Sequence, residues 1–334
     1  MRAAITFLIL FNTSVLLVNA QQLITVQHLG TPTFYTDIAL AINGSLAGDT
    51  IYIPGGVYPG SNLTISKELH LIGVGHNPNY STATDYSILN SNIYFYEGAD
   101  HSSVTGLLIN GSIFFNSSGL SFIHISRCNL GNNFILMNAT VFNSTVSECI
   151  LNYIQAEFES YNNAFYNNIF LTGIFNFGAN NLVANNVFVF NGSYPINSIL
   201  SSEIRNNIFL CVNNNIIIGN SLTVKNNLVI NSIICDLSWI CSGNINAQPL
   251  NSIFVNYPQT GAGFSYSDDY HLQATSPGKN AGTDGTDIGI YGGAFPWKDG
   301  SVPYNPHITV KNIASTTDSA GKLNIYVTVV AQDH

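Results

Sequence analysis

Between residues 125 and 229, apolar and polar positions follow a block that recurs about every twenty residues. Each block places a β-branched or aromatic residue first, a Cys or Asn three positions later, and an apolar residue two positions after that. The Cys or Asn positions are spaced by 21, 19, 18, 21 and 20 residues: Cys128, Cys149, Asn168, Asn186, Asn207 and Asn227. Self-similarity at this period predicts a solenoid, in which each coil buries its apolar face against its neighbours.

Equivalent positions of successive coils lie above one another in a parallel stack, so each position of the block predicts a column. One apolar column is Ile125, Val146, Phe165, Val183, Ile204 and Val224. A second is Leu130, Leu151, Phe170, Phe188, Phe209 and Val229. We expect both columns to fill the interior. We interpret Asn168, Asn186, Asn207 and Asn227 as a structural Asn ladder, because stacked amides bond to each other and Asn tolerates left-handed corners.

The two ends of the repeat region carry different patterns. Residues 36–46 have the apolar spacing of a short helix, which we expect to cap the N-terminal end of the solenoid. Residues 243–256 and 261–269 are rich in turn-forming residues and are expected to close the C-terminal end. Residues 308–330 alternate between apolar and polar, which predicts a terminal hairpin or strand pair packed on the solenoid.

The first twenty residues have the layout of an export signal. Arg2 supplies a positive charge, residues 3–18 are largely apolar, and Val18-Asn19-Ala20 forms a small-residue cleavage pattern. The alternative is a membrane anchor, but residues 12–14 interrupt the apolar run, and spanning needs about 20 apolar residues. We therefore predict a signal peptide at 1–20 and a secreted, extracellular or cell-surface protein with no later transmembrane segment.

The charge balance limits the classes of partner that the protein is expected to bind. Without Arg2, 8 basic residues face 18 acidic ones, and only 8% of the whole chain is charged. Nucleic-acid binding is not expected, because it needs clustered Lys and Arg.

The five cysteines are Cys128, Cys149, Cys211, Cys235 and Cys241. The first two occupy adjacent coils and are either bridged or stacked as thiols, the last two are able to close a small loop, and none has zinc-site spacing.

A family resemblance starts in residues 48–75. There a strand ending in Ile-Pro-Gly-Gly-x-Tyr precedes an alternating strand, a Lys and Leu-x-Leu-Ile-Gly. This segment resembles the first coil of right-handed parallel β-helix proteins, the pectate-lyase-like group, and the Asn-Asn-Ile-Phe repeats resemble their later coils. Residues 269–293 and 303–308 are similar to the last coil of many secreted bacterial members.

The resemblance covers about residues 24–310. It implies an all-β chain with a right-handed parallel β-helix over 21–305. With the patterns described above, we expect a short capping helix near its start and a β extension over 306–334. It implies little about activity, because this fold carries lyases, hydrolases and adhesins.

Catalysis in the related lyases implies an Arg or Lys base and a calcium ion held by several carboxylates. No aspartate stands between Asp100 and Asp236, so that calcium site is not predicted in the coils. The weak catalytic candidates are the charged residues Arg127, Glu148, Glu157, Glu159 and Arg205.

Two of these candidates are carboxylates that could act as the catalytic pair of a glycosidase. Glu157 and Glu159 would point to the same side of one strand, outward if Phe158 is buried, about 6.6 Å apart. That separation is near the range of inverting carboxylate pairs, although a solvated acidic spot is the favoured interpretation. Arg127 and Glu148 are expected to form a surface ion pair worth less than about 1 kcal/mol.

Ligand-binding candidates come from basic and aromatic residues. Arg205 and Lys225 share a column beside Glu203 and are suited to attract an acidic sugar. Tyr153, Tyr161 and Tyr166 lie among Asn and Ser, where aromatic faces would meet a polysaccharide, although tyrosines also fill space on strand faces.

The metal candidates are Asp284 and Asp287, with Asp299 and Asn280 nearby. They are able to bind calcium, but their spacing differs from an EF-hand, and bracing of a turn by Asn280 and Asp287 is favoured. No other cofactor is predicted.

Three functions remain in competition. The leading one is a non-catalytic polysaccharide-contacting or adhesive protein. The alternatives are a polysaccharide lyase or glycoside hydrolase with an atypical site, and a structural protein that self-associates.

Overall fold

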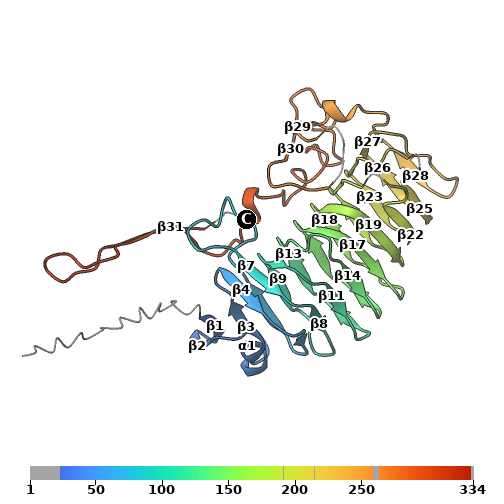
Figure 1. The fold of residues 1–334 in the computed structure, drawn as a ribbon. Helices are drawn as coiled ribbons and strands as arrows, with labels where there is room; N and C mark the ends of the chain where they lie inside the picture. The colour runs from blue at the N-terminus through green and yellow to red at the C-terminus, as the bar shows by residue number, and fades with distance from the viewer. Residues whose placement is uncertain (1–22, 191, 214, 259–262, 332–334) are drawn as a thin grey trace, which may run out of the picture.

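The computed structural model describes residues 23–331 apart from residues 191, 214 and 259–262. The predicted signal peptide lies outside these residues. The described chain forms a parallel β-solenoid of about ten turns, which agrees with the expected right-handed parallel β-helix (Figure 1).

One long sheet, sheet A, runs the length of the solenoid. Its first two strands, β1 (Ile24–His28) and β2 (Thr31–Tyr35), pair antiparallel at the N-terminal end. The others are parallel and follow in coil order: β3 (Asp49–Tyr52), β6 (Leu69–Ile72), β9 (Ser103–Thr105), β13 (His124–Ser126), β16 (Thr145–Ser147), β18 (Ala164–Tyr166), β20 (Leu182–Ala184), β23 (Glu203–Arg205), β26 (Thr223–Lys225) and β28 (Ile240–Ser242).

A second long sheet, sheet B, forms another side of the coils. Its strands are β5 (Leu63–Ile65), β8 (Ile93–Phe95), β11 (Ile113–Phe115), β14 (Ile135–Met137), β17 (Ile150–Ala156), β19 (Ile169–Phe177), β21 (Val187–Phe188), β22 (Ile196–Leu200), β24 (Ile208–Phe209), β25 (Ile217–Asn220) and β27 (Leu228–Val229). Short strands complete the early coils: β4 (Gly56–Pro59), β7 (Ser87–Asn90), β10 (Leu108–Ile109), β12 (Leu120–Ser121) and β15 (Val141–Phe142).

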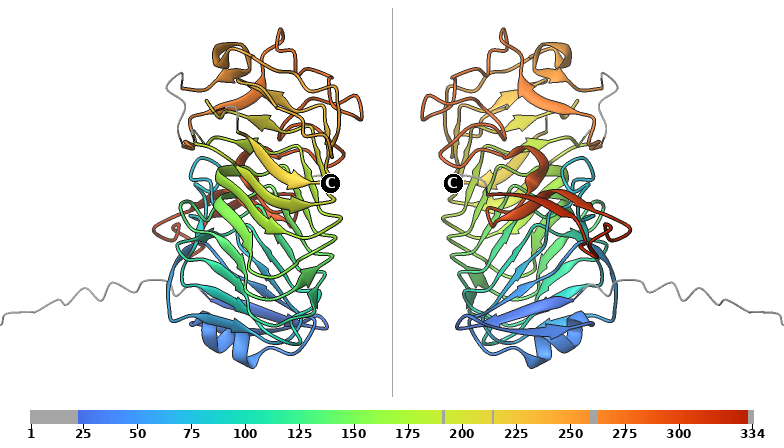
Figure 2. Two further views of the ribbon diagram at one scale, coloured as in Figure 1. Left: turned by 90° about the vertical axis from the view of Figure 1, so that its right-hand side faces the viewer. Right: turned by 90° about the vertical axis from the view of Figure 1, so that its left-hand side faces the viewer.

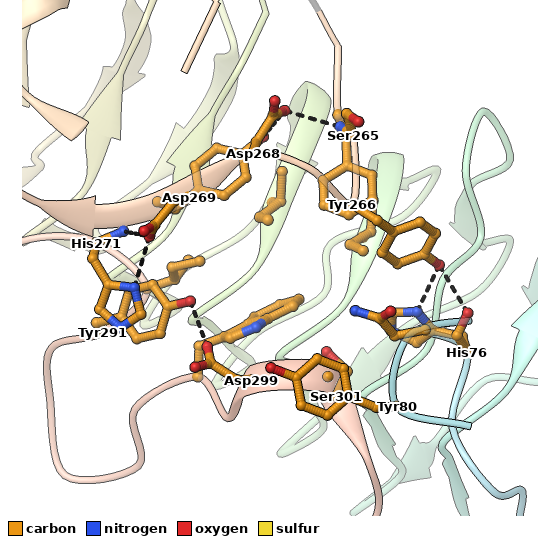
Figure 3. Close-up of a pocket in the computed structure, with 18 residues that line it drawn as sticks. His76, Tyr80, Ser265, Tyr266, Asp268, Asp269, His271, Tyr291, Asp299 and Ser301 are labelled. Atoms are coloured by element: carbon orange, nitrogen blue, oxygen red, sulfur yellow. Dashed lines mark hydrogen bonds and ion pairs between the residues drawn. The ribbon is translucent and has the colours of Figure 1, made fainter. Parts of the chain in front are cut away.

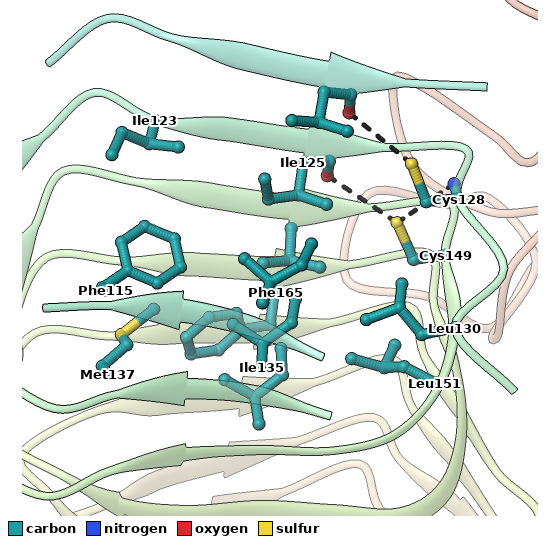
Figure 4. Close-up of a cluster of buried hydrophobic side chains, with 14 of the residues drawn as sticks. Phe115, Ile123, Ile125, Cys128, Leu130, Ile135, Met137, Cys149, Leu151 and Phe165 are labelled. Carbon is teal, nitrogen blue, oxygen red and sulfur yellow. Dashed lines mark hydrogen bonds between the residues drawn. The ribbon is translucent and has the colours of Figure 1, made fainter. Parts of the chain in front are cut away.

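The predicted interior columns are confirmed. Val146 pairs in register with Ile125 on one side and Phe165 on the other, and the whole column is buried. In the second column, the rings of Phe170, Phe188 and Phe209 stack with centroids 5.0 and 4.7 Å apart. Figure 4 shows members of both columns pointing into the same core. Because each coil offers apolar groups only to its neighbours, this burial fixes the register of the stack.

Helix α1 (Ile38–Gly44) caps the N-terminal end, as expected from residues 36–46 (Figure 2). Asp37 begins it by accepting a hydrogen bond from the backbone N–H of Leu40 at 2.8 Å. The helix buries Ile38, Ala41 and Ile42 against the first coil and leaves Leu40 exposed.

The Asn ladder is also confirmed. The side-chain oxygen of Asn207 accepts from the backbone and side-chain nitrogens of Asn186, both at 2.9 Å. Its Nδ2 donates to the carbonyl oxygen of Val183 and to Asn227, again at 2.9 Å. Asn168 joins one end of the ladder, and Asn244, which was not predicted, extends the other. Cys128 and Cys149 hold the equivalent positions of earlier coils as stacked, buried free thiols, while Cys235 and Cys241 form a disulfide.

The left-handed corner expected of the ladder residues belongs instead to the residue before each one. Positive φ angles near 50° occur at Arg127, Glu148, Asn167, Asn185, Asn206 and Asn226. We call these six residues the corner column. The residue after each corner keeps ordinary backbone geometry and is buried: a cysteine after Arg127 and Glu148, and a ladder Asn after the other four.

After the last coils the chain reverses along the flank of the solenoid (Figure 1). The intervening chain contains η1 (Leu250–Ser252) and the antiparallel pair β29 (Phe254–Asn256) and β30 (Asp269–Leu272). Residues 276–305, which include η2 (Asp299–Ser301), then run back past the corner column, and we call them the strap. Ile253, Phe254 and Leu272 join Ile290 of the strap and Val187 of the coils in a second apolar cluster. The predicted closing loops thus pack on the flank and lead into the strap.

Corner residues and strap residues pair in opposite order along the chain. Asn226 donates to the carbonyl oxygen of Ala281 at 2.8 Å, and the side-chain oxygen of Asn206 accepts from the backbone N–H of Thr283 at 2.9 Å. The remaining contacts join Asn185 to Gly289, Asn167 to Ile290 and Gly292, Glu148 to Lys298, and Arg127 to Val302. The corner column therefore holds the strap, one coil at a time.

The C-terminal hairpin consists of β31 (His307–Ile313) and β32 (Ile325–Val330), which pair antiparallel as predicted. Its expected packing on the solenoid is wrong for most of its length, because the hairpin projects away from the coils (Figure 1). Apolar side chains such as Ile313, Ile325 and Val329 are consequently exposed.

Replacing Asn207 by Ala tests the ladder. The variant would leave the nitrogens of Asn186 and the carbonyl oxygen of Val183 buried without their partner. We expect the free energy of unfolding, measured by urea denaturation, to fall by about 3 kcal/mol. The matched change at exposed Asn132 should cost less than about 0.5 kcal/mol. Equal effects of the two changes would contradict a structural ladder.

Candidate functional site

The outer face of sheet A carries the best-ordered set of polar side chains near the predicted ligand residues. Strand alternation turns one column inward and its two neighbours outward. One outward column comprises Thr105, Ser126, Ser147, Tyr166, Ala184, Arg205, Lys225 and Ser242, in register on successive strands. Tyr166, Arg205 and Lys225 were all predicted to bind ligand, and the structure brings them into this single column.

Hydroxyl and imidazole groups dominate the N-terminal half of this face. His124 Nδ1 lies 2.6 Å from the hydroxyl of Thr145, and Ser126 donates to Thr105 at 3.0 Å. Partial burial lowers the pKa of His124, and the nearby His101 and His70 lower it further. The imidazole is therefore neutral at pH 7, and this half of the face offers uncharged donors and acceptors.

Cationic groups mark the C-terminal half. Arg205 and Lys225 are paired residues of adjacent strands, about 4.8 Å apart at the backbone. Arg205 Nη1 donates to Thr283 of the strap at 3.0 Å, and its Nε lies 3.5 Å from Glu203. Tyr166 stands two strands before Arg205 in the same column, so an extended ligand would meet an aromatic ring and then two cations.

The strap forms a raised edge beside this face. Phe295 and Tyr304 of the strap join His124 and Tyr166 of the face in lining a depression of about 240 Å³. Its lining combines the hydroxyl groups of Ser126, Thr145 and Ser147 with these aromatic rings and with Glu148. This combination suits a sugar ring, whose edge bonds to polar groups while its face packs on aromatic carbon.

The predicted surface ion pair between Arg127 and Glu148 is buried. Arg127 is 0% and Glu148 4% exposed, and the Arg127 Nε lies 3.0 Å from a Glu148 oxygen. The Arg127 guanidinium stacks 3.6 Å from the ring centroid of Tyr304 and also donates to the carbonyl oxygen of Val302. The sequence prediction failed because the strap that covers the pair comes from more than a hundred residues away.

The environment of Glu148 fits a structural role. Burial raises the pKa of its carboxyl group, while the Arg127 guanidinium favours the ionised form. The same carboxylate accepts a hydrogen bond from the backbone N–H of Lys298 at 3.3 Å. Both members of the pair thus fasten the strap, and they carry no indication of a catalytic role.

The glutamate pair was placed on a strand incorrectly. Strand β17 ends at Ala156, and Glu157, Phe158 and Glu159 follow it in an exposed bend. Phe158 is 58% exposed, so the alternation that would aim both carboxylates to one side is absent from this segment. The pair borders a groove on a different side of the coils from the outer face of sheet A.

Two predicted aromatic residues lie away from the face. Tyr153 is on sheet B, where its ring stacks with Phe134 at 4.8 Å and meets Phe175 edge-on. Tyr161 follows that sheet at a corner and stacks with Phe142 at 5.4 Å. Both belong to aromatic stacks between neighbouring coils, so of the three tyrosines only Tyr166 accompanies Arg205 and Lys225.

The proposed calcium ligands do not converge. Asp287 pairs with Lys279 at 2.7 Å and accepts from the backbone N–H of Asn280 at 2.9 Å. Asp284 accepts from Thr286, and Asp299 accepts from Tyr291. Within the described parts of the chain, no group of three or more His, Cys, Asp or Glu residues is placed to hold a metal ion.

A second cleft was not predicted from the sequence. It lies between the strap and the loop around His76, and residues 264–271 form its far wall. The loop around His76 is about 190 residues from 264–271 and farther from the strap, and no period links them, so their meeting could not be predicted. The density of aromatic and acidic residues in 264–271 was the only available signal.

Comparison with known proteins gives no functional lead. The chain matches no protein-family model, and a search of curated proteins returned no match. Among the described residues, the helices are too short or too polar to cross a bilayer.

Replacing Glu148 by Gln tests the buried pair. The change would leave the Arg127 charge buried without a carboxylate, and we expect the free energy of unfolding to fall by about 3 kcal/mol. Glu203→Gln, which alters an exposed pair with Arg205, should cost less than about 1 kcal/mol. Urea denaturation of both variants provides the measurement, and a neutral effect of Glu148→Gln would contradict the fastening role.

Proposed function

We propose that this protein is secreted and binds a polysaccharide, without cleaving it, along the outer face of sheet A. The observation that carries the proposal is the register that places Tyr166, Arg205 and Lys225 in one outward column. A linear ligand lying along the stack would meet these side chains in sequence, beginning or ending at the hydroxyl-rich half.

The chemistry of the column favours a polysaccharide that carries some carboxylate groups. Arg205 and Lys225 supply two adjacent positive charges on a chain that is otherwise acidic. Ser126, Ser147 and Thr145 add neutral hydroxyl groups that exchange hydrogen bonds with sugar hydroxyls. Partly exposed charges give modest, salt-sensitive binding, so affinity would come from many repeated contacts.

Export is supported by two features of the chain. The first twenty residues have the layout of a signal peptide, and Cys235 and Cys241 form a disulfide, which is typical of oxidising compartments. A rigid solenoid bearing a polar face suits a protein that meets large ligands outside the cell.

The absence of a suitable acid and base pair on the face favours binding over cleavage. Hydrolysis of a glycosidic bond by an inverting or retaining enzyme requires two carboxyl groups about 5–9.5 Å apart. On the described face, Glu203 lies beside Arg205, and Glu148 is buried under the strap. A lyase that used Arg205 as its base is the alternative enzyme, and its products distinguish it from a binding protein.

Affinity electrophoresis against neutral and acidic polysaccharides tests the proposal. We expect retardation by an acidic polysaccharide, weakened by added salt. The double variant Arg205→Gln, Lys225→Gln should lose most of that retardation, because it removes both cations of the column. Lys311→Gln, Lys322→Gln makes the same charge change on the hairpin and should bind as the unmodified protein does.

Two outcomes would contradict the proposal. Equal loss in both double variants would show that only net charge matters. Release of reducing ends, or of unsaturated products absorbing in the ultraviolet, would show that the protein cleaves its ligand.

Self-association is a second candidate function, favoured by the projecting hairpin. A two-stranded ribbon is marginally stable alone, and this one exposes apolar side chains from both strands, including Val310, Ile325 and Val327. Its free strand edges are able to pair with another copy of the hairpin. The third function inferred from the sequence thus has a specific surface to carry it.

Light scattering at increasing protein concentration tests this candidate. We expect the apparent mass to rise with concentration and Ile325→Glu to suppress the rise, because a charge in the apolar ribbon opposes pairing. Leu40→Glu, at an exposed apolar position on the capping helix, should leave the association intact. A constant mass at all concentrations would exclude this function.

A further inference from the structure

The second cleft has a composition unlike that of the sheet A face. Figure 3 shows it between His76 and Tyr266 on one side and His271 and Tyr291 on the other, with Asp299 below. Its volume is about 210 Å³, below the range of typical drug-sized pockets, which indicates a ligand of about one ring.

Aromatic rings form much of the wall. His271 stacks on Tyr291 with ring centroids 3.7 Å apart, and Phe264 meets Tyr266 edge-on. Tyr80, Tyr270 and Trp297 are also in the aromatic lining. Ring faces of this kind attract positive charge through their quadrupole and pack against apolar carbon.

The charged groups of the lining are mainly carboxylates. Three carboxylates border the cleft, from Asp268, Asp269 and Asp299, and the lining, drawn from the described chain, contains neither Lys nor Arg. Asp269 is paired with His271 at 2.7 Å, while Asp299 accepts only a neutral phenol hydrogen bond from Tyr291 at 2.8 Å. Negative charge in the cleft thus exceeds the positive charge available to balance it.

His76 adds a buried ring nitrogen that lacks a hydrogen-bond partner in the described chain. It is 1% exposed, and its Nε2 has no hydrogen-bond partner among the described residues. The Tyr266 hydroxyl, which has a single proton, lies within hydrogen-bond distance of the carbonyl oxygen of His76 and 2.8 Å from Nδ1. When Tyr266 donates to the carbonyl oxygen, Nδ1 carries the ring proton and Nε2 is an acceptor; when Tyr266 donates to Nδ1, Nε2 carries the proton. In both tautomers the buried Nε2 lacks a partner among the described residues.

Further polar groups surround His76. Asn129 donates to the Tyr266 oxygen at 2.7 Å, so that oxygen is already engaged in the network. Burial lowers the pKa of His76 to about 3, which keeps its ring neutral. The buried hydroxyl of Ser301, also on the lining, likewise lacks a partner among the described residues.

We propose that the cleft binds a small organic cation, a protonated amine carried on a single ring, such as an amino sugar. An ammonium group supplies the hydrogen-bond donors and the positive charge that the carboxylates lack, and aromatic faces pack on the ring that bears it. A neutral sugar would leave the charge uncompensated, and an acidic sugar would be repelled. The cleft therefore selects the opposite charge from the one favoured on sheet A, and the proposal stands independently of that function.

Isothermal titration calorimetry with glucosamine, glucose and glucuronate tests the charge preference. At about pH 6 the amine is protonated. We expect saturable binding of glucosamine, at least tenfold weaker binding of glucose and none of glucuronate. Glucose binding as tight as glucosamine binding, or the absence of saturable glucosamine binding to folded protein, would overturn the proposal.

Asp299→Asn locates the binding. It removes one negative charge from the cleft while keeping an acceptor for Tyr291, and we expect at least a tenfold loss of glucosamine affinity. Asp284→Asn makes the same change on a strap turn outside the cleft and should leave affinity unchanged. Equal affinity of the two variants would place the amine elsewhere and overturn the assignment.

Tyr80→Ala keeps the test decisive if Asp299→Asn does not fold. Tyr80 is 49% exposed, so its truncation should leave the fold intact while removing an aromatic wall. We expect a threefold or greater loss of glucosamine affinity, with no change in retardation by acidic polysaccharide. Unchanged glucosamine affinity in this variant would contradict binding in the cleft.

Discussion

Every coil of this solenoid contains polar backbone groups that must form hydrogen bonds with the neighbouring coil. The buried amides of the Asn ladder meet that constraint, because each side chain accepts from the preceding rung and donates to the following one. Each amide also donates to a strand carbonyl, as Asn207 does to Val183. An unpaired amide in this position would cost about 1–3 kcal/mol, so the ladder holds the apolar columns in the only register that satisfies it.

Two adjacent positions of the repeat, the corner residue and the ladder residue, have different structural roles. The ladder residue turns inward, and the preceding corner residue, in left-handed geometry, turns outward to the strap. Asn performs both tasks because its amide donates and accepts and its backbone tolerates that corner. Where Arg127 and Glu148 replace Asn at the corner, two opposite charges replace the amide contacts, and their burial under the strap requires that they pair.

The features predictable from the sequence were those that repeat. A fixed period set the interior columns and the ladder, and it implied the shared column of Arg205 and Lys225, because columns follow from arithmetic on the repeat. The strap was unpredictable, since its contacts join residues as distant as Arg127 and Val302 without any period. The burial of Glu148 and the cleft around His76 both depend on the strap, so they escaped prediction for the same physical reason.

The strap is also the structural link between the two candidate binding regions. Thr283 and Tyr304 border the outer face of sheet A, whereas Trp297 and Asp299 line the acidic cleft. One segment thus presents neutral and aromatic groups beside a cationic column and carboxylates beside an aromatic wall. Because the corner column fixes this segment coil by coil, loosening it near Glu148 would disturb both regions together, while a change on the coils alone would disturb one.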